Sequence, residues 1–401
     1  MKQPTRSHAL SLLLAACLLI CLAPHAQAAQ PIQATNDRAT LVFPNQITFR
    51  VELAGANPIQ SATLEYSVDQ LTCGTVKARA LPAFRPALRV QAAWTWKMEE
   101  SGSLPPGAQV RWQWRVNDNA GNQLLTEPRA VIWLDDLHPW HTLSSQKINL
   151  HWYQGNEAFG RRMLGAAQAA LTTVSQKLGL QASRPIELYL YADGDEMRQA
   201  VFYKPDWTGG MAYPAHNIAI IGIAPDDETW GQRAIAHEIT HIVVDRYGFS
   251  CLGSRPTWLD EGLAVFIEGG PTDAEQEQFQ TALDDDNLIA LSALDAGFGK
   301  DDYTVSLAYT ESYSLVNFLL MHYGRDRLLS FIDLLRNGAA TQPALQAAYG
   351  LDEFGLEDAW RSQIGAKRQG AGVTPPATRA SIDLFVFAPV VASGGQHVSA
   401  C

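Results

Sequence analysis

Two patterns of hydrophobic and polar positions divide the chain. From about residue 37 to 137, apolar residues recur at every second position in short runs such as ALRVQAAWTW and AQVRWQWRVND. The turn-forming runs GANP, SLPPG and DNAGN separate these stretches. Alternation of this kind is typical of half-buried strands. We therefore expect an antiparallel β-sandwich of immunoglobulin-like architecture over 37–137.

The pattern changes at about residue 145. A strand-like run, KINLHWYQG, is followed by a 22-residue amphipathic stretch ending at Gly179, and then by two more strand-like runs, PIELYLYAD and NIAIIGIAP. Helical periodicity dominates the rest, in the runs RAIAHEITHIVVDRYG, TWLDEGLAVFIE, VSLAYTESYSLVNFLLMHYG, RDRLLSFIDLLRNG and LEDAWRSQIG. Strands first and helices later indicate an α+β domain over 145–365. Residues 366–401 are typical of a linker-like tail.

The first residues have the pattern of an export signal. Lys2 and Arg6 precede a short apolar run, and AQA at 26–28 is a small-residue cleavage site. We therefore expect a signal peptide at 1–28, an exported bacterial protein, and no transmembrane helix in the mature chain. The run LAAC also resembles a lipobox, which leaves lipid anchoring at Cys17 as an alternative.

Charge and cysteine content narrow the function classes. The 401-residue chain has a formal net charge of −11, which becomes −13 when residues 1–28 leave with Lys2 and Arg6. An acidic balance predicts no nucleic-acid partner; it does not define an oligomeric state. Three cysteines remain, at 73, 251 and 401, so the mature chain can form one disulfide bond at most. Three pairings are open, and Cys73–Cys251 would join the two regions.

The run HEITH at 237–241 carries the candidate chemistry. On a helix His237 and His241 share one face, so both imidazoles can bind one metal ion, and Glu238 can reach a water molecule on that ion. A catalytic zinc site needs a third protein ligand, and Glu261 in PTWLDEGLA follows at a separation that fits two antiparallel helices. Its neighbour Asp260 would point about 100° away. The structural alternative is an amphipathic helix with polar residues in a suggestive order.

These two runs carry a family resemblance. HEITHIVVD followed by WLDEGLA resembles the gluzincin metallopeptidases, the superfamily of thermolysin and aminopeptidase N, and is most similar to bacterial peptidase MA-like proteins. The resemblance covers about 145–365 and implies a thermolysin-like fold with one catalytic Zn²⁺. It implies that His237, His241 and Glu261 bind zinc and that Glu238 is the general base. In YTESYSLV, Tyr309 takes the position of an oxyanion-binding tyrosine, with Tyr313 as the alternative.

The family pattern is altered in two places. The lysine and glycine that follow the tyrosine in the aminopeptidases' Y-x-K-G-x-x-V are here Glu311 and Ser312. In GGMAY, Ala212 replaces the glutamate that grips a free amino terminus in the aminopeptidases' G-A-M-E-N, which favours cleavage of internal bonds. Two further residues keep open roles. His216 is either a second metal or substrate contact or a solvated loop residue, and Asp245 either orients a ligand histidine or is exposed.

The sequence therefore predicts an exported zinc metallopeptidase, a hydrolase that acts on a peptide or protein substrate and is most consistent with an endopeptidase. Two alternatives remain. One is a catalytically weak or inactive zinc-binding scaffold protein, which the altered YTES run would allow. The other is a zinc hydrolase that acts on non-peptide substrates.

Overall fold

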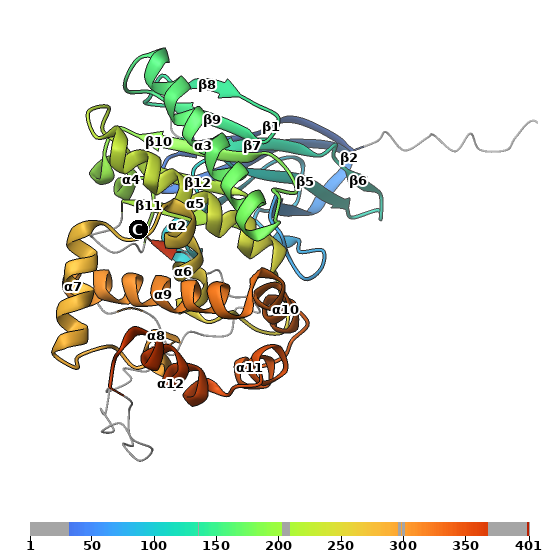
Figure 1. Cartoon of the computed structure of the whole chain (residues 1–401). Helices are drawn as coiled ribbons and strands as arrows, with labels where there is room; N and C mark the ends of the chain where they lie inside the picture. Colours follow the sequence, from blue (N-terminus) through green and yellow to red (C-terminus); the bar gives the residue numbers. More distant parts are fainter. Residues whose placement is uncertain are drawn as a thin grey trace, which may run out of the picture.

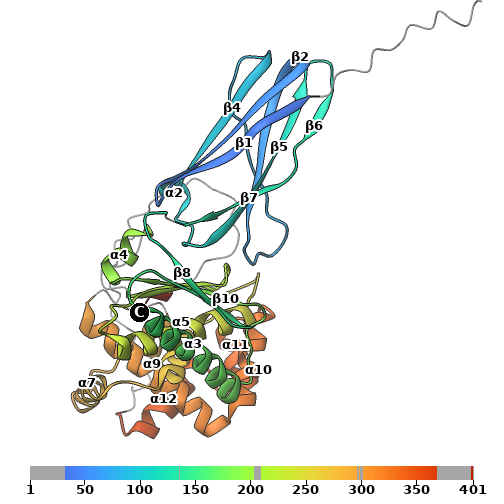
Figure 2. The same ribbon diagram turned by 90° about the horizontal axis from the view of Figure 1, so that it is seen from above.

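The structure is a computed structural model, and it describes residues 32–134, 136–202, 209–295, 298, 301–367 and 399–400. A sheet-rich N-terminal region is followed by a helix-rich region (Figure 1). In Figure 2 the strands β1–β7 stand at one end of the molecule and most of the helices lie at the other. The signal-peptide prediction for residues 1–28, including Cys17, falls outside the described residues.

Seven antiparallel strands and one short helix form the N-terminal region. They are β1 (Gln33–Val42), β2 (Gln46–Val68), β3 (Ala78–Ala80), β4 (Ala87–Lys97), α2 (Met98–Ser101), β5 (Ala108–Asp118), β6 (Gln123–Leu125) and β7 (Arg129–Trp133). The 23-residue strand β2 pairs with β1 and β4 along its first half, and with β5 and β3 along its second half. All seven strands therefore belong to one hydrogen-bonded sheet with the path β1-β2-β5-β6.

This continuity is where the structure departs from our expectation. The run GANP at 55–58, which we read as a turn between two strands, lies inside β2. The pairing of β2 with β4 shifts register between Ala54 and Ile59, as it does at a β-bulge, so the chain bends there and continues as a strand. The expected immunoglobulin-like sandwich is therefore not confirmed. Alternation predicts which residues form strands, but it does not predict which strands pair.

Alternation does identify the core of this sheet. Along β5, Val110, Trp112, Trp114 and Val116 are buried and alternate with more exposed residues. The indole Nε1 atoms of Trp112 and Trp114 donate hydrogen bonds to Oδ1 of buried Asp37, at 2.8 and 3.2 Å. Buried polar groups need hydrogen-bond partners. These two hydrogen bonds satisfy the indole N–H groups of both tryptophans and also Oδ1 of the buried Asp37 carboxylate.

The second sheet has the order β13-β11-β12-β10-β9-β8. Its strands are β8 (His141–Ser144), β9 (Ile148–Trp152), β10 (Ile186–Tyr191), β11 (Gly210–Tyr213), β12 (Ile218–Gly222) and β13 (Ser399–Ala400). The three central strands β9, β10 and β12 are parallel, and the outer strands β8, β11 and β13 run antiparallel to their neighbours. The sheet therefore has its antiparallel strands at its edges.

Both faces of this sheet are buried. Leu188 and Leu190 of β10 pack among the helices, whereas Tyr189 and Tyr191 pack with the core of the N-terminal sheet. Strands that are buried on both faces read as continuous apolar runs without alternation, which is the pattern of PIELYLY and NIAIIG. The N-terminal region is therefore packed against the second sheet.

The helices follow in an order that matches the strand-first, helix-later prediction. They are α3 (Glu157–Leu178), α4 (Gly194–Gln199), α5 (Glu228–Tyr247), α6 (Thr257–Glu268), α7 (Asp273–Asp284), α8 (Leu291–Asp295), α9 (Asp302–Tyr323), α10 (Arg325–Arg336), α11 (Thr341–Tyr349) and α12 (Glu353–Ile364). Helix α6 packs between α5 and α9. At Gly262 a Cβ atom would lie 2.3 Å from the Ser312 carbonyl oxygen, so only glycine allows α6 and α9 to approach this closely.

Covalent and polar contacts connect the two regions. A disulfide bond joins Cys73 to Cys251, which is the pairing that would tie the two regions together. Close by, Arg184 Nη1 lies 3.0 Å from Asp69 Oδ2, and the Leu71 N–H donates to the Ala215 carbonyl at 2.7 Å. Within the described residues, the structure contains no helix with the length and apolar character needed to cross a membrane.

Candidate metal centre

Helix α5 presents the two histidines on one buried face. It begins after Asp227 and ends before Gly248, whose N–H donates to the Val244 carbonyl at 2.8 Å. His237 and His241 are 2% and 1% exposed, and the centroids of their rings are 4.7 Å apart. The i, i+4 spacing therefore brings both imidazoles together, as the sequence predicted.

Helix α6 brings a carboxylate to the same point. Glu261 Oε2 lies 3.3 Å from His237 Nε2 and 3.2 Å from His241 Nε2. One ligand atom from each of the three residues lies within 4.8 Å of the others. Among the described residues, no other group of three histidine, cysteine, aspartate or glutamate side chains has this arrangement. The residues predicted to be metal ligands are thus in contact.

The chemistry of this group fits a divalent metal ion. Within the described chain, His241 Nε2 and Glu261 Oε2 are buried and make no hydrogen bond, although a buried polar atom normally has a partner. Burial raises the pKa of the Glu261 carboxyl, but the imidazoles of His241 and His237 beside it outweigh burial and hold the pKa at about 2. Two imidazoles and a carboxylate are a donor set that zinc takes in hydrolases, with a further position left for water.

Glu238 lies beside this group, against strand β11. Its side chain is fully buried. A Cβ atom added to Gly210 would lie 2.7 Å from Glu238 Oε1, so the backbone of β11 passes directly over the carboxylate. Burial raises the pKa of Tyr213, at the other end of β11, and the charge of Glu238 raises it further. Gly210 is therefore required for the close approach of β11 to Glu238.

The structure adds a residue that our sequence reasoning missed. His237 Nδ1 lies 2.8 Å from Glu268 Oε2, and Glu268 Oε1 accepts a hydrogen bond from Arg233 Nη2 at 2.5 Å. A carboxylate on the far nitrogen of a metal-binding histidine fixes the ring orientation and tautomer. Glu268 follows Glu261 by seven residues, which is two helical turns, and this spacing is the signal that could have identified it.

Asp245 forms an ion pair with Arg255. Arg255 is buried between Asp245 and Asp260, with Nη2 on Asp245 and Nε 2.7 Å from Asp260 Oδ1. Burial disfavours the charged guanidinium, but the two carboxylates outweigh this and raise the pKa of Arg255 above its ordinary value. Asp245 and Asp260 therefore tie the end of α5 to the start of α6. The loop that connects the two ligand-bearing helices is held by this ion-pair cluster.

The two candidate tyrosines of α9 point to different places. The Tyr309 ring lies 5.9 Å from the His237 ring and 4.9 Å from the Phe298 ring, measured between centroids. The Tyr313 ring packs against Phe266, at 6.5 Å, and its hydroxyl lies near Gly270. Tyr309 is thus the tyrosine of this pair that adjoins the histidines.

Two residues of the segment before α5 also have defined positions. Ala212 is fully buried in β11, opposite Ala219 of β12. His216 is 5% exposed, and burial lowers its pKa to about 4. It is therefore not the solvated loop residue we considered. It is also not part of the metal-binding group found among the described residues.

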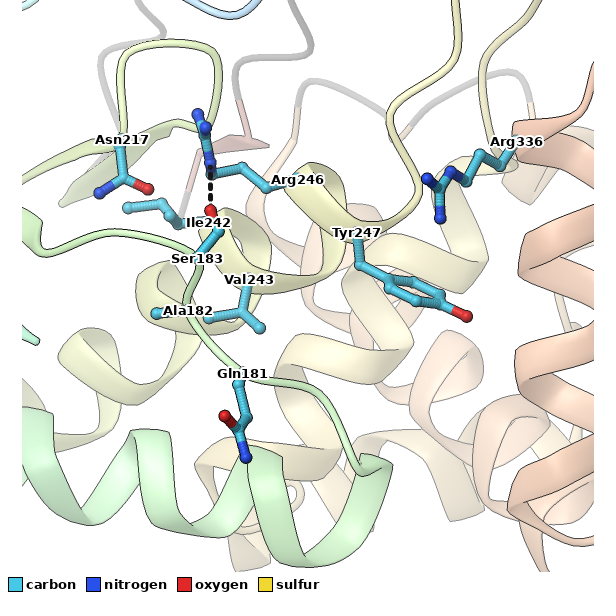
Figure 3. Close-up of a pocket in the computed structure, with 9 residues that line it drawn as sticks. All are labelled: Gln181, Ala182, Ser183, Asn217, Ile242, Val243, Arg246, Tyr247 and Arg336. Atoms are coloured by element: carbon cyan, nitrogen blue, oxygen red, sulfur yellow. Dashed lines mark hydrogen bonds between the residues drawn. The ribbon is translucent and has the colours of Figure 1, made fainter.

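A separate cavity lies against the C-terminal half of α5. Its volume is about 220 Å³. Figure 3 shows the side chains that line it, among them Arg246 and Tyr247 of α5, Ser183, and Arg336 of α10. Arg246 Nε donates to Ser183 Oγ at 3.3 Å. No residue of the candidate metal centre lines this cavity, so it is not part of the site.

Comparisons with known proteins identify a family for the helix-rich part of the chain. The family described as the Peptidase MA superfamily matches residues 166–366. Similar solved structures include an M1 zinc metallopeptidase from Deinococcus radiodurans, with 12% identity, a TM-score of 0.38, and coverage of 86% of this chain and 95% of that chain. Another is Legionella pneumophila aminopeptidase A in complex with aspartic acid, with 11% identity, a TM-score of 0.35, and coverage of 82% and 50%. Comparison with curated proteins finds no match.

Proposed function

Because the chain belongs to the Peptidase MA superfamily, we propose that it is a zinc-dependent metallopeptidase that cleaves internal peptide bonds. One observation carries the proposal: the side chains of His237, His241 and Glu261 meet at one buried point, with the Glu238 carboxylate beside them. Glu238 is not among the three grouped ligands. A metal site without catalytic activity has no need for such an additional buried carboxylate. A buried carboxylate beside them is expected where a proton is transferred.

The three ligands would hold one zinc ion through His237 Nε2, His241 Nε2 and a Glu261 carboxylate oxygen. When bound, zinc supplies a Lewis acid that polarises a carbonyl group and lowers the pKa of water. Glu268 would accept a hydrogen bond from His237 Nδ1 and so keep the ring turned with Nε2 towards the zinc ion. Arg233 would in turn hold the Glu268 carboxylate in place. The ligand set is thus prearranged by α5 and α6.

Glu238 would act as general base and then as general acid. Its carboxylate would take a proton from the attacking water and transfer it to the nitrogen of the departing amine. The Tyr309 hydroxyl would donate a hydrogen bond to the oxygen of the attacked carbonyl as negative charge develops there. The ring of Tyr309 lies next to that of His237, which supports this role.

The preference for internal bonds rests on β11. The aminopeptidase pattern places a carboxylate where this chain has Ala212, which cannot form an ion pair with a free amino group. A substrate would instead be held through its backbone along β11, where specificity for a chain end is not built in. We therefore propose an endopeptidase acting on extended peptide or unfolded protein segments.

Export forms part of the proposal. The Cys73–Cys251 disulfide bond is of the kind that persists in oxidising compartments, and this supports the export signal expected at 1–28. The acidic net charge argues against a nucleic-acid partner and does not define the substrate.

The decisive experiment measures zinc per mole together with cleavage of an unfolded protein. Wild type, Glu238→Gln and the control Glu277→Gln, an exposed residue of α7, would be compared. We expect one zinc in all three proteins and a loss of cleavage by a factor of about 10² to 10⁴ in Glu238→Gln alone. Zinc without cleavage in wild type would favour the zinc-binding scaffold, and turnover of esters alone would favour a non-peptide hydrolase. A lack of zinc in all three would refute the metal centre.

A further inference from the structure

Strand β11 is paired along both of its edges. On one side Met211 and Ala212 lie opposite Ile220 and Ala219 of β12. On the other side Met211 lies opposite Ala400 and Ala212 opposite Ser399, in antiparallel register. Figure 1 shows this short strand β13, coloured dark red beside the mark C, next to β11. The outer edge of the second sheet is thus taken by a segment that is distant in the sequence.

This edge adjoins the candidate general base. β11 begins at Gly210, where a Cβ atom would lie 2.7 Å from Glu238 Oε1. An edge strand presents unpaired N–H and C=O groups, and extended peptides bind such edges as an added strand. A peptide on the outer edge of β11 therefore lies beside Glu238, which is the position a substrate backbone needs.

The direction of β13 is also informative. Because Ser399 faces Ala212 and Ala400 faces Met211, increasing residue number leads along β11 towards Gly210. The segment therefore approaches Glu238 with its carboxyl side leading. The part of a substrate that precedes the attacked bond has the same orientation when it pairs antiparallel to β11. Ser399–Ala400 thus occupies the edge in the sense of a substrate's acyl side.

We propose that the segment Ser399–Ala400 is an intramolecular competitor that occupies the substrate edge of β11 and lowers the affinity for substrate. This regulation rests on the proposed peptidase function. The 31 residues between Lys367 and Ser399 can reach on the order of 100 Å if extended, so chain length permits the contact. Because the competitor is tethered, its effect does not depend on protein concentration, unlike inhibition by a second molecule.

The first test compares peptide cleavage by the full chain, a deletion of 399–401, and the double variant Ser399→Pro/Ala400→Pro. Alternate residues of an antiparallel strand donate to the ladder, and proline has no N–H, so the double variant removes the donor in either register. We expect KM to fall about tenfold in both variants with kcat unchanged, since one or two backbone hydrogen bonds are lost. Ser393→Pro, in the tail outside β13, is the control and should match wild type.

A second readout separates this inference from the proposed function. In a Glu238→Gln background, binding of a fluorescent peptide with the sequence of residues 391–400 is measured for the full chain and for the 399–401 deletion. We expect at least about tenfold tighter binding to the deletion protein. Equal dissociation constants and equal KM values would overturn the proposal. If no protein cleaves peptides, the peptidase function fails, and the binding measurement still decides whether the segment occupies β11.

Discussion

Gly210→Ala tests the contact between β11 and the candidate base. The added methyl carbon would lie 2.7 Å from Glu238 Oε1 and 3.2 Å from its Cγ and Cδ, whereas ordinary contact begins at 3.4 Å. The carboxylate must therefore move by roughly 0.7 Å, because the backbone at Gly210 is paired with Ile221 of β12 and cannot easily shift. A displacement of about 1 Å at a reacting group costs about 10²-fold in rate. We expect kcat/KM to fall by about 10- to 100-fold.

The loss should appear in activity and not in stability or metal content. The atom that must move is the end of a rotatable side chain, so relaxation costs little, and we expect the free energy of unfolding to change by less than about 1 kcal/mol. The three candidate ligands are not displaced, so zinc per mole should remain at the wild-type value. The assays are kcat/KM on a peptide substrate, urea denaturation and metal analysis.

Gly165→Ala is the matched control for Gly210→Ala. Gly165 lies in α3, and a Cβ atom there would meet no other atom within 4 Å. We expect unchanged activity and a stability gain of up to about 1 kcal/mol, because alanine favours helix over glycine. If Gly210→Ala retained wild-type kcat/KM, the placement of Glu238 against β11 would be wrong, or Glu238 would not be the base.

Three further predictions concern the surroundings of the site. Glu268→Ala should weaken zinc binding by about 10- to 100-fold in competition with a chelator, because His237 loses the partner of its Nδ1. Arg255→Ala should lower the free energy of unfolding by about 3–5 kcal/mol in urea denaturation, because two largely buried carboxylates lose their cation. Burial raises the pKa of Glu311 to about 8, so wild-type stability should fall as pH rises from about 4.5 to 8, and Glu311→Gln should remove this fall.

Each of these predictions has a control. Glu277→Gln, on an exposed face of α7, should leave zinc affinity unchanged, and equal affinity in Glu268→Ala would contradict the role given to Glu268. Arg325→Ala removes an exposed ion pair with Asp326 and should cost less than about 1 kcal/mol. For Glu311, the two proteins should be equally stable near pH 3, where the carboxyl is protonated in both the folded and the unfolded state. A parallel pH dependence in both proteins would refute the assignment.

The candidate metal ligands could be predicted because their spacing is local. His237 and His241 are one turn apart on a single helix, so helical geometry alone brings them together. Glu261 follows on the next helix after a short connection, and antiparallel packing of two such helices leaves few placements. The contact between Glu238 and Gly210 could not be predicted, because it depends on how β11 packs over α5 and no periodicity reports that distance.

The sheets show the same limit. The alternating runs identify the buried faces of the N-terminal strands, but the length of β2 depends on whether Gly55–Pro58 turns or bulges, and both outcomes suit those residues. Helix α7 was missed because its run TDAEQEQFQ is largely polar. Its capping box of Thr272 and Glu275 was the available signal. The pairing of Ser399–Ala400 with β11 joins residues nearly 190 positions apart, which no local pattern records.

The disulfide bond determines how the molecule would respond to mechanical tension. Cys73 and Cys251 lie 178 positions apart in the sequence, and the chain between them forms a covalent ring that contains β11, β12 and α5. A force applied between residues 32 and 367 would pass through the sulfur atoms, so a contour length of roughly 600 Å stays unextended until the bond is reduced. His237 and His241 lie inside the ring, whereas Glu261 lies outside it. Pulling would therefore draw the carboxylate away from the two imidazoles while both histidines remain in place.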